Sequence, residues 1–128
     1  MTIRIETTSF DAHEPYAMAQ WWATALGWEV TDGGPADDEV SIAPTSDSPE
    51  RGIMPELLFC RVPEGKTVKN RIHLDLRPDD QAAEVARFEA LGATRVDVGQ
   101  EGNPDVTWVV LADPEGNEFC ILRTRPPS

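Results

Sequence analysis

Residues 108–122, WVVLADPEGNEFCIL, decide the fold that the sequence predicts. Residues 109–111 are apolar and mostly β-branched, as in a buried strand, and residues 119–122 have a similar character. Between them, residues 113–117 have the chemistry of a tight turn, because proline presets φ at about −65° and glycine adopts positive φ without steric cost. We therefore expect two strands joined by a short turn, with Cys120 in the second strand.

The rest of the chain indicates one structural unit that occurs twice. A strand at 3–10 precedes a helix at 14–26 that ends at Gly27, and a strand at 71–76 precedes a helix at 79–91 that ends at Gly92. Both helices end in Ala-Leu-Gly. Their apolar faces are predicted to contain Met18, Trp21 or Trp22, Ala25 and Leu26 in the first helix, and Ala82, Val85, Phe88 and Leu91 in the second. The other expected strands are 29–31, 40–43, 57–62, 94–98, 106–111 and 119–122.

Each half is therefore a βαβββ module, and the fold class is α+β, with two modules forming a curved mixed sheet. We expect module 1 at about 1–62, a connector at 63–69 and module 2 at about 70–125. One such unit cannot bury both faces of its sheet, whereas two units packed together can. The sequence thus predicts a single domain over residues 1–128, with a concave face on its sheet.

Composition excludes several functions. Eleven Lys and Arg against 23 Asp and Glu give a net charge of −12, which repels nucleic acids and anionic membranes. The sequence contains no apolar run of the ~20 residues that a membrane span needs. Residues 1–4 do not resemble a secretion signal, so we expect a cytoplasmic protein. In that compartment Cys60 and Cys120 are expected to be free thiols or ligands.

Three stretches resemble the glyoxalase-like branch of the vicinal-oxygen-chelate superfamily, which includes glyoxalase I, extradiol dioxygenases and bleomycin-resistance proteins. They are residues 69–76 (KNRIHLDL), the two Ala-Leu-Gly helix ends, and residues 113–119 (DPEGNEF). The resemblance covers nearly the whole chain and implies the glyoxalase-like fold and a homodimer. It does not by itself imply one chemistry, because one fold hosts many functions.

Metal-dependent members that the chain resembles take two ligands from the first strands of the modules and two from the last strands. Carried over, the second-half positions fall on His73, which suits a metal, and on Cys120. The first-strand position of the first half falls on Thr7, a poor ligand, and Cys60 is the plausible ligand in the last strand of that half. This altered set favours a pocket without a metal, so no cofactor is predicted.

His73 has two interpretations. It alternates with Arg71 and Asp75 along the strand at 71–76, while Ile72, Leu74 and Leu76 occupy the opposite face. On the cavity side it could bind a ligand oxygen or act as a general base. It could equally be a remnant of a metal-binding ancestor, now hydrogen-bonded to a neighbour.

The cysteines and tryptophans are further candidates. Cys60, Cys120 and His73 could form a zinc site with an open position, although buried cysteines usually act as small apolar side chains. Trp28 and Trp108 could line an apolar pocket or pack in the core. Residues 33–55 could form a lid over the pocket or a simple loop.

We therefore carry two functional hypotheses. The first is a metal-independent small-molecule binding protein of the glyoxalase/bleomycin-resistance type, with its ligand held on the concave face. The second is a metal-dependent lyase, isomerase or dioxygenase with a non-standard ligand set around His73, in which zinc would be held by His73, Cys120 and Cys60. The candidate pocket residues are Trp28, His73, Trp108, Cys120, Cys60 and Thr7.

Overall fold

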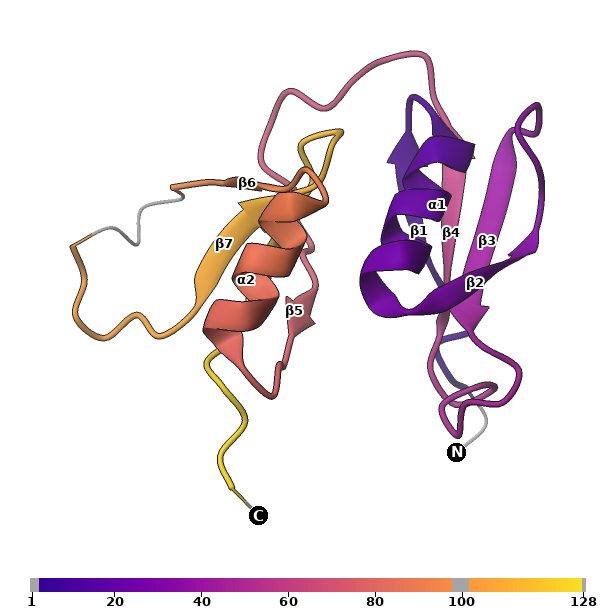
Figure 1. The fold of residues 1–128 in the computed structure, drawn as a ribbon. Helices are drawn as coiled ribbons and strands as arrows, with labels where there is room; N and C mark the ends of the chain where they lie inside the picture. The colour runs from indigo at the N-terminus through magenta and orange to yellow at the C-terminus, as the bar shows by residue number, and fades with distance from the viewer. Residues whose placement is uncertain (1–2, 98–101, 128) are drawn as a thin grey trace. The chain divides into compact units, whose positions relative to one another are not determined.

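The computed structural model describes residues 3–97 and 102–127 (Figure 1). The chain divides into two compact units, residues 1–65 and 66–128, and the boundary lies within the predicted connector at 63–69. Among the described residues each unit has one helix and one four-stranded mixed sheet. Both units therefore have the predicted βαβββ order, and the α+β fold class is confirmed.

The first unit has the strand order β1-β4-β3-β2. β1 runs parallel to β4, and the other neighbouring strands are antiparallel. α1 begins with Pro15 in its first turn and is followed by Gly27, whose φ of 70° is the left-handed conformation that favours glycine. The elements are β1 (Thr7–Ala12), α1 (Pro15–Leu26), β2 (Trp28–Asp32), β3 (Glu39–Pro44) and β4 (Glu56–Arg61).

The second unit has the equivalent order, β5-β8-β7-β6, again with a parallel pair at one edge. The Asp80 side chain caps α2 by accepting a hydrogen bond from the backbone N–H of Ala83 at 3.1 Å. The elements are β5 (Asp75–Leu76), α2 (Gln81–Ala90), β6 (Thr94–Arg95), β7 (Val109–Ala112) and β8 (Glu118–Ile121).

Each helix covers one face of its own sheet (Figure 1). In the first unit Met18 and Trp22 of α1 are buried, and Ile42 of β3 and Phe59 of β4 are fully buried. In the second unit Phe88 of α2 lies with its ring centroid 5.4 Å from that of Phe119. Of the predicted pair, Trp22 is therefore the core residue. The opposite face of each sheet remains available for polar side chains.

The first strand of each half differs from the prediction. β1 begins at Thr7, and Ile3 and Ile5 before it are exposed. β5 contains only Asp75–Leu76, so it is shorter than the strand predicted at 71–76, and Ile72 of the predicted apolar face is 74% exposed. The pairing of β5 with β8 begins only at Asp75, and before it the backbone N–H of Asn70 donates to the Glu118 side chain at 2.9 Å.

Two smaller differences concern α2 and β6. Ala82 is exposed, so the buried face of α2 is carried by Val85 and Phe88. Val98 of the strand predicted at 94–98 lies outside the described residues.

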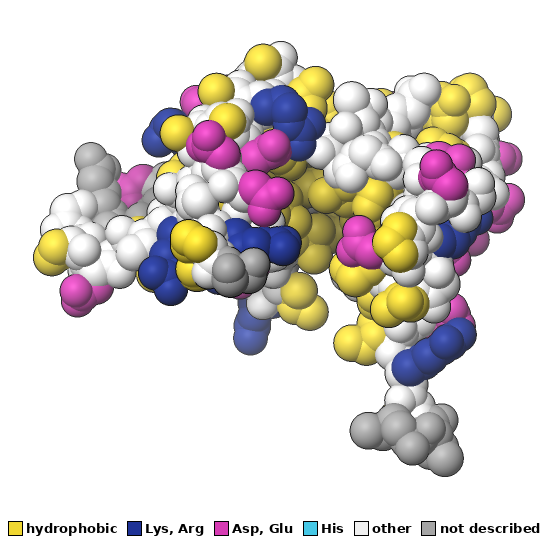
Figure 2. Space-filling model, turned by 60° about the horizontal axis from the view of Figure 1, so that its bottom comes forward, with side chains coloured by type: hydrophobic (Ala, Val, Ile, Leu, Met, Phe, Trp, Pro, Cys, Tyr) yellow, Lys and Arg dark blue, Asp and Glu magenta, His cyan; other side chains and the backbone are white. Residues whose placement is uncertain are grey.

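Large apolar side chains also reach the surface in both units, and Figure 2 shows apolar side chains among acidic and basic ones on the face that it displays. They include Ile3, Ile5, Ile53 and Met54 in the first unit and Val68, Ile72 and Trp108 in the second. Within the described part of the chain, neither helix combines the length and the apolar character needed to cross a bilayer.

Candidate functional site in the second unit

The turn at 113–117 fixes the geometry of the site. Asp113 is buried, and its Oδ1 accepts hydrogen bonds from the backbone N–H groups of Glu115 and Asn117, both at 2.9 Å. Gly116 has a φ of 89°, as the predicted turn requires. The turn places Cys120 opposite Val110, and the parallel pairing of β5 with β8 places Asp75 on the other side of Cys120.

A cavity of about 390 Å³ opens on this face of the second unit. Its apolar wall is formed by Trp108, Val110, Leu122 and Cys120, and its polar groups are Lys69, His73, Asp75 and Glu118. The predicted candidates His73, Trp108 and Cys120 thus meet in one cavity. An apolar wall with a few convergent polar groups is the usual character of a small-molecule site.

His73, Asp75 and Cys120 form the polar cluster of the cavity. His73 Nδ1 lies 3.2 Å from Asp75 Oδ1 and 3.9 Å from Cys120 Sγ. A relay from thiol to imidazole to carboxylate needs the two partners on opposite ring nitrogens, whereas here both approach Nδ1. Burial, together with the negative charge of Asp75, raises the pKa of the Cys120 thiol to about 11. The thiol is therefore protonated at neutral pH, and the cluster is not arranged for nucleophilic cysteine catalysis.

The same cluster fits a divalent metal in donor type and spacing. The nitrogen, oxygen and sulfur donors of His73, Asp75 and Cys120 all lie within 4.8 Å of one another. Three such ligands and an open position suit zinc. The metal would have to displace the thiol proton of Cys120, so its affinity would depend strongly on pH.

Glu118 forms a buried polar network beside this cluster. Only 8% of Glu118 is exposed, and its carboxylate lies 2.6 Å from Lys66 Nζ and accepts from the Asn70 backbone N–H at 2.9 Å. The Asn70 side chain donates to Asn117 Oδ1 at 3.0 Å. Burial alone would raise the pKa of Glu118, but the hydrogen bonds from Lys66 and Asn70 hold it below its usual range. The network ties residues 66–70 to the β7–β8 turn.

Sequence reasoning missed Lys69 and Glu118 as cavity residues. A signal for Glu118 was present, because it lies two residues before Cys120 and therefore on the same face of β8. Lys69 had no comparable signal, since its position depends on the contacts that hold residues 66–70.

The other predicted candidates lie in the first unit. Thr7 of β1 pairs with Glu56 of β4, and Trp28 of β2 pairs with Pro44 of β3. Cys60 donates from Sγ to Glu39 Oε2 at 3.8 Å, and burial and the charge of Glu39 raise its thiol pKa.

The pairing registers identify the first-unit counterpart of Cys120. Glu29 and Thr94, each two residues after the glycine that follows its helix, pair with Ala43 and Ala112. Two residues before these partners, Ser41 and Val110 pair with Leu58 and Cys120. The counterpart of Cys120 is therefore Leu58, and Cys60 lies two residues further along β4.

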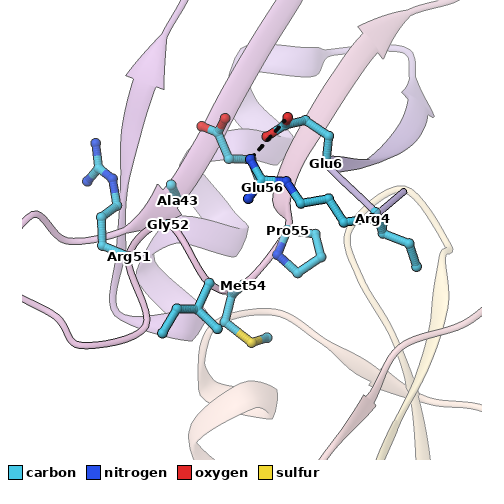
Figure 3. Close-up of a pocket in the computed structure, with 10 residues that line it drawn as sticks. Arg4, Glu6, Ala43, Arg51, Gly52, Met54, Pro55 and Glu56 are labelled. Atoms are coloured by element: carbon cyan, nitrogen blue, oxygen red, sulfur yellow. Dashed lines mark ion pairs between the residues drawn. The ribbon is translucent and has the colours of Figure 1, made fainter. Parts of the chain in front are cut away.

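The first unit has cavities of its own, among them one of about 220 Å³ (Figure 3). Its two guanidinium groups already have partners: Arg4 lies 3.7 Å from Glu6, and Arg51 Nη1 lies 2.8 Å from Glu29 Oε1. Residues 51–55 of the loop before β4 form much of its wall, together with Ala43 of β3. None of the predicted site residues lines this cavity.

Several solved structures are similar to this chain. An oxidase, ChaP-H2, is 22% identical with a TM-score of 0.66, over 98% of this chain and 96% of that one. A glyoxalase/bleomycin resistance protein/dioxygenase family enzyme from Burkholderia phytofirmans PsJN is 16% identical with a TM-score of 0.68, over 96% and 100%. The bleomycin-binding protein from Streptomyces verticillus, complexed with copper(II)-bleomycin, is 16% identical with a TM-score of 0.60, over 98% and 99%. These likenesses show the fold.

A comparison with curated proteins gives no match. The sequence profile of the glyoxalase-like domain matches residues 7–122. This match runs from the first residue of β1 to the residue after β8 and so includes both modules and the second-unit cavity. The chain therefore belongs to the glyoxalase-like domain family, within the vicinal-oxygen-chelate superfamily.

Proposed function

We propose that the protein binds a small, largely apolar molecule in the second-unit cavity without a metal ion. The observation that carries this proposal is the cavity itself, in which Trp108, Val110 and Leu122 form an apolar wall beside His73 and Asp75. Burying a ligand against such a wall supplies the main favourable free energy, and the polar groups fix its orientation.

Metal binding at the cluster would require loss of a proton. In the metal-free protein the Cys120 thiol keeps its proton at neutral pH, and a metal would have to displace it. At the positions equivalent to Asp75 and Cys120 the first unit has Ser9 and Leu58, which are poorer metal ligands. The bleomycin-binding protein with the same fold is a precedent for small-molecule binding.

Titration with 2-naphthamide, a neutral aromatic probe, tests the proposal on chelator-treated protein followed by ¹H–¹⁵N NMR. We expect saturable shifts at the Trp108 indole and at the backbone N–H groups of His73 and Cys120. Trp108→Ala should weaken binding about tenfold through lost apolar contact. Trp28→Ala is the matched control and should leave the affinity unchanged. Shifts that map to other residues, or binding that requires added metal, would contradict the proposal.

A second candidate function is a metal-dependent enzyme, and the spacing of His73, Asp75 and Cys120 is the observation that favours it. These residues would hold a divalent ion, which would act as a Lewis acid on substrate oxygens. Zinc titration by calorimetry tests this candidate. One tightly bound zinc per chain, lost in both His73→Ala and Cys120→Ser but kept in Cys60→Ser, would support the enzyme over the metal-free binder.

Three further expectations belong to this proposal: that the two modules form a single domain, that the chain forms a homodimer, and that it works in the cytoplasm. Burial supports the first, because one βαβββ unit cannot bury both faces of its sheet, whereas two units packed together can. Light scattering coupled to size-exclusion chromatography tests the second, and one cooperative unfolding transition by two probes tests the first.

A further inference from the structure

We infer that the ligand of the second-unit cavity carries a negatively charged group on its apolar body, and that Lys69 recognises that group. This inference rests on the proposed function and names its ligand class. Lys69 lines the cavity with an exposed side chain, on the same wall as Glu118. Among the described residues no carboxylate comes within 4.0 Å of its ammonium group.

Both carboxylates of the cavity already have partners. Glu118 forms its ion pair with Lys66 at 2.6 Å and accepts from the Asn70 backbone, so its charge is balanced within the buried network. Asp75 is half exposed and lies 3.2 Å from His73 Nδ1. His73 balances the charge of Asp75 only when its imidazole is protonated. Lys69 is thus the lining cation without an ion pair among the described residues, and within the cavity the charge of Asp75 opposes it. Beside the apolar wall of Trp108 and Val110 the interaction would be stronger than on an open surface.

The Glu118 network also explains why Lys69 lies at the cavity. Lys66 and Asn70, on either side of Lys69 in sequence, are both bound to the Glu118 carboxylate. Asn70 is fixed a second time through Asn117, whose amide donates to both Asp113 oxygens at 3.1 and 2.9 Å. Glu118 is therefore a positioning residue: it acts on the ligand through the backbone of residues 66–70.

The overall charge of the protein opposes the binding of an anion. A net charge of −12 attracts cations and repels anions at long range. A preference for an anionic ligand would therefore have to arise locally, within the cavity.

Three probes that share one ring system test the inference: 2-naphthoate, 2-naphthamide and 2-naphthylmethylammonium. Calorimetric titrations at 0.15 M salt, a concentration that screens long-range charge to about 8 Å, should rank naphthoate first. We expect it to bind about tenfold more tightly than the ammonium probe. Lys69→Met should bring the affinities for naphthoate and naphthamide within about twofold of each other. Arg71→Met removes a nearby exposed charge that does not line the cavity, and should keep the wild-type preference.

Glu118→Gln separates positioning from direct contact. It removes a negative charge from the cavity lining and frees the Lys66 ammonium, and both changes favour an anion. A loss of about threefold to fivefold in naphthoate affinity, the size we expect from displacement of residues 66–70, would therefore report positioning, and naphthamide should change little. Equal binding of all three probes, or a naphthoate preference that survives Lys69→Met, would overturn the inference while leaving the proposed function standing. If none of the three probes binds, the proposed function itself fails and the inference falls with it.

Discussion

The two units have the same topology but different polar faces. In the first unit Leu58 of β4 lies between Ser9 and Ser41, whereas in the second Cys120 of β8 lies between Asp75 and Val110. Both last strands begin with a glutamate, Glu56 or Glu118. The scaffold is thus repeated, but among the described residues the cluster with metal-ligand spacing, His73, Asp75 and Cys120, lies in the second unit. A duplicated fold does not require a duplicated site.

The side chains buried between each helix and its sheet should contribute most to the free energy of unfolding. Trp22 is 1% exposed, so Trp22→Ala should lower the free energy of unfolding by about 3–5 kcal/mol through lost burial and the cavity that remains. Urea denaturation followed by circular dichroism measures the loss. The neighbouring Trp21→Ala, which removes a half-buried ring, is the control and should cost less than half as much. Equal losses would mean that the two rings do not differ in packing as described.

The second-largest difference is expected in how much the ion pairs of the two units contribute to stability. Glu118 is buried and ion-paired with Lys66, of whose side chain 20% is exposed, whereas the pair between Glu29 and Arg51 in the first unit is exposed. Glu118→Gln should therefore cost about 2 kcal/mol, and Glu29→Gln no more than about 1 kcal/mol. The same urea experiment compares them at neutral pH. A larger loss for Glu29→Gln would contradict the structural role given to the second-unit network.

The smallest expected difference between the units is in how their thiols make stability depend on pH. Because the pKa of Cys120 is raised to about 11, the folded state keeps a proton that the unfolded chain loses near its ordinary value of 9.0. The contribution of Cys120 is therefore fully present below pH 9.0 and is lost as pH rises toward about 11. Between about pH 8 and about pH 10 the wild type should lose about 1 kcal/mol more than Cys120→Ala does.

Cys60→Ala is the matched thiol variant in the first unit. The pKa of the wild-type Cys60 thiol is also raised, but its side chain is only half buried. Removing it should therefore change the pH dependence of stability in the same direction as Cys120→Ala, but less. Urea unfolding in the presence of reductant at both pH values measures all three proteins. If Cys120→Ala shows the same pH dependence as the wild type, the thiol is not held as described.

Most of the fold could be predicted from periodicity and turn chemistry. The two Ala-Leu-Gly ends locate both helices, and residues 113–117 locate the β7–β8 turn, because these features depend on local conformation. The first strands were predicted less well. Ile3, Ile5 and Ile72 have the composition of strand residues, but the partner strand does not extend beside them, and composition cannot reveal where a partner ends.

The site was predictable where it depended on strand alternation and not where it depended on register between strands. Alternation along residues 71–76 placed His73 and Asp75 on one face, and the turn placed Cys120 in β8. Cys60 was chosen because cysteine is a plausible ligand, but the registers of the antiparallel strands make Leu58 the counterpart of Cys120. Lys69 depends on the Glu118 network, which joins residues about fifty positions apart in sequence.

Ligand binding without a metal in the second-unit cavity is our main proposal. Its most direct test is the affinity for 2-naphthoate before and after dialysis against a chelator, with the zinc content of the same samples measured by mass spectrometry. We predict less than stoichiometric zinc, an unchanged affinity and an unchanged melting temperature. Stoichiometric zinc that is lost in His73→Ala, together with naphthoate binding abolished by the chelator, would contradict the claim and identify the cluster of His73, Asp75 and Cys120 as a metal centre.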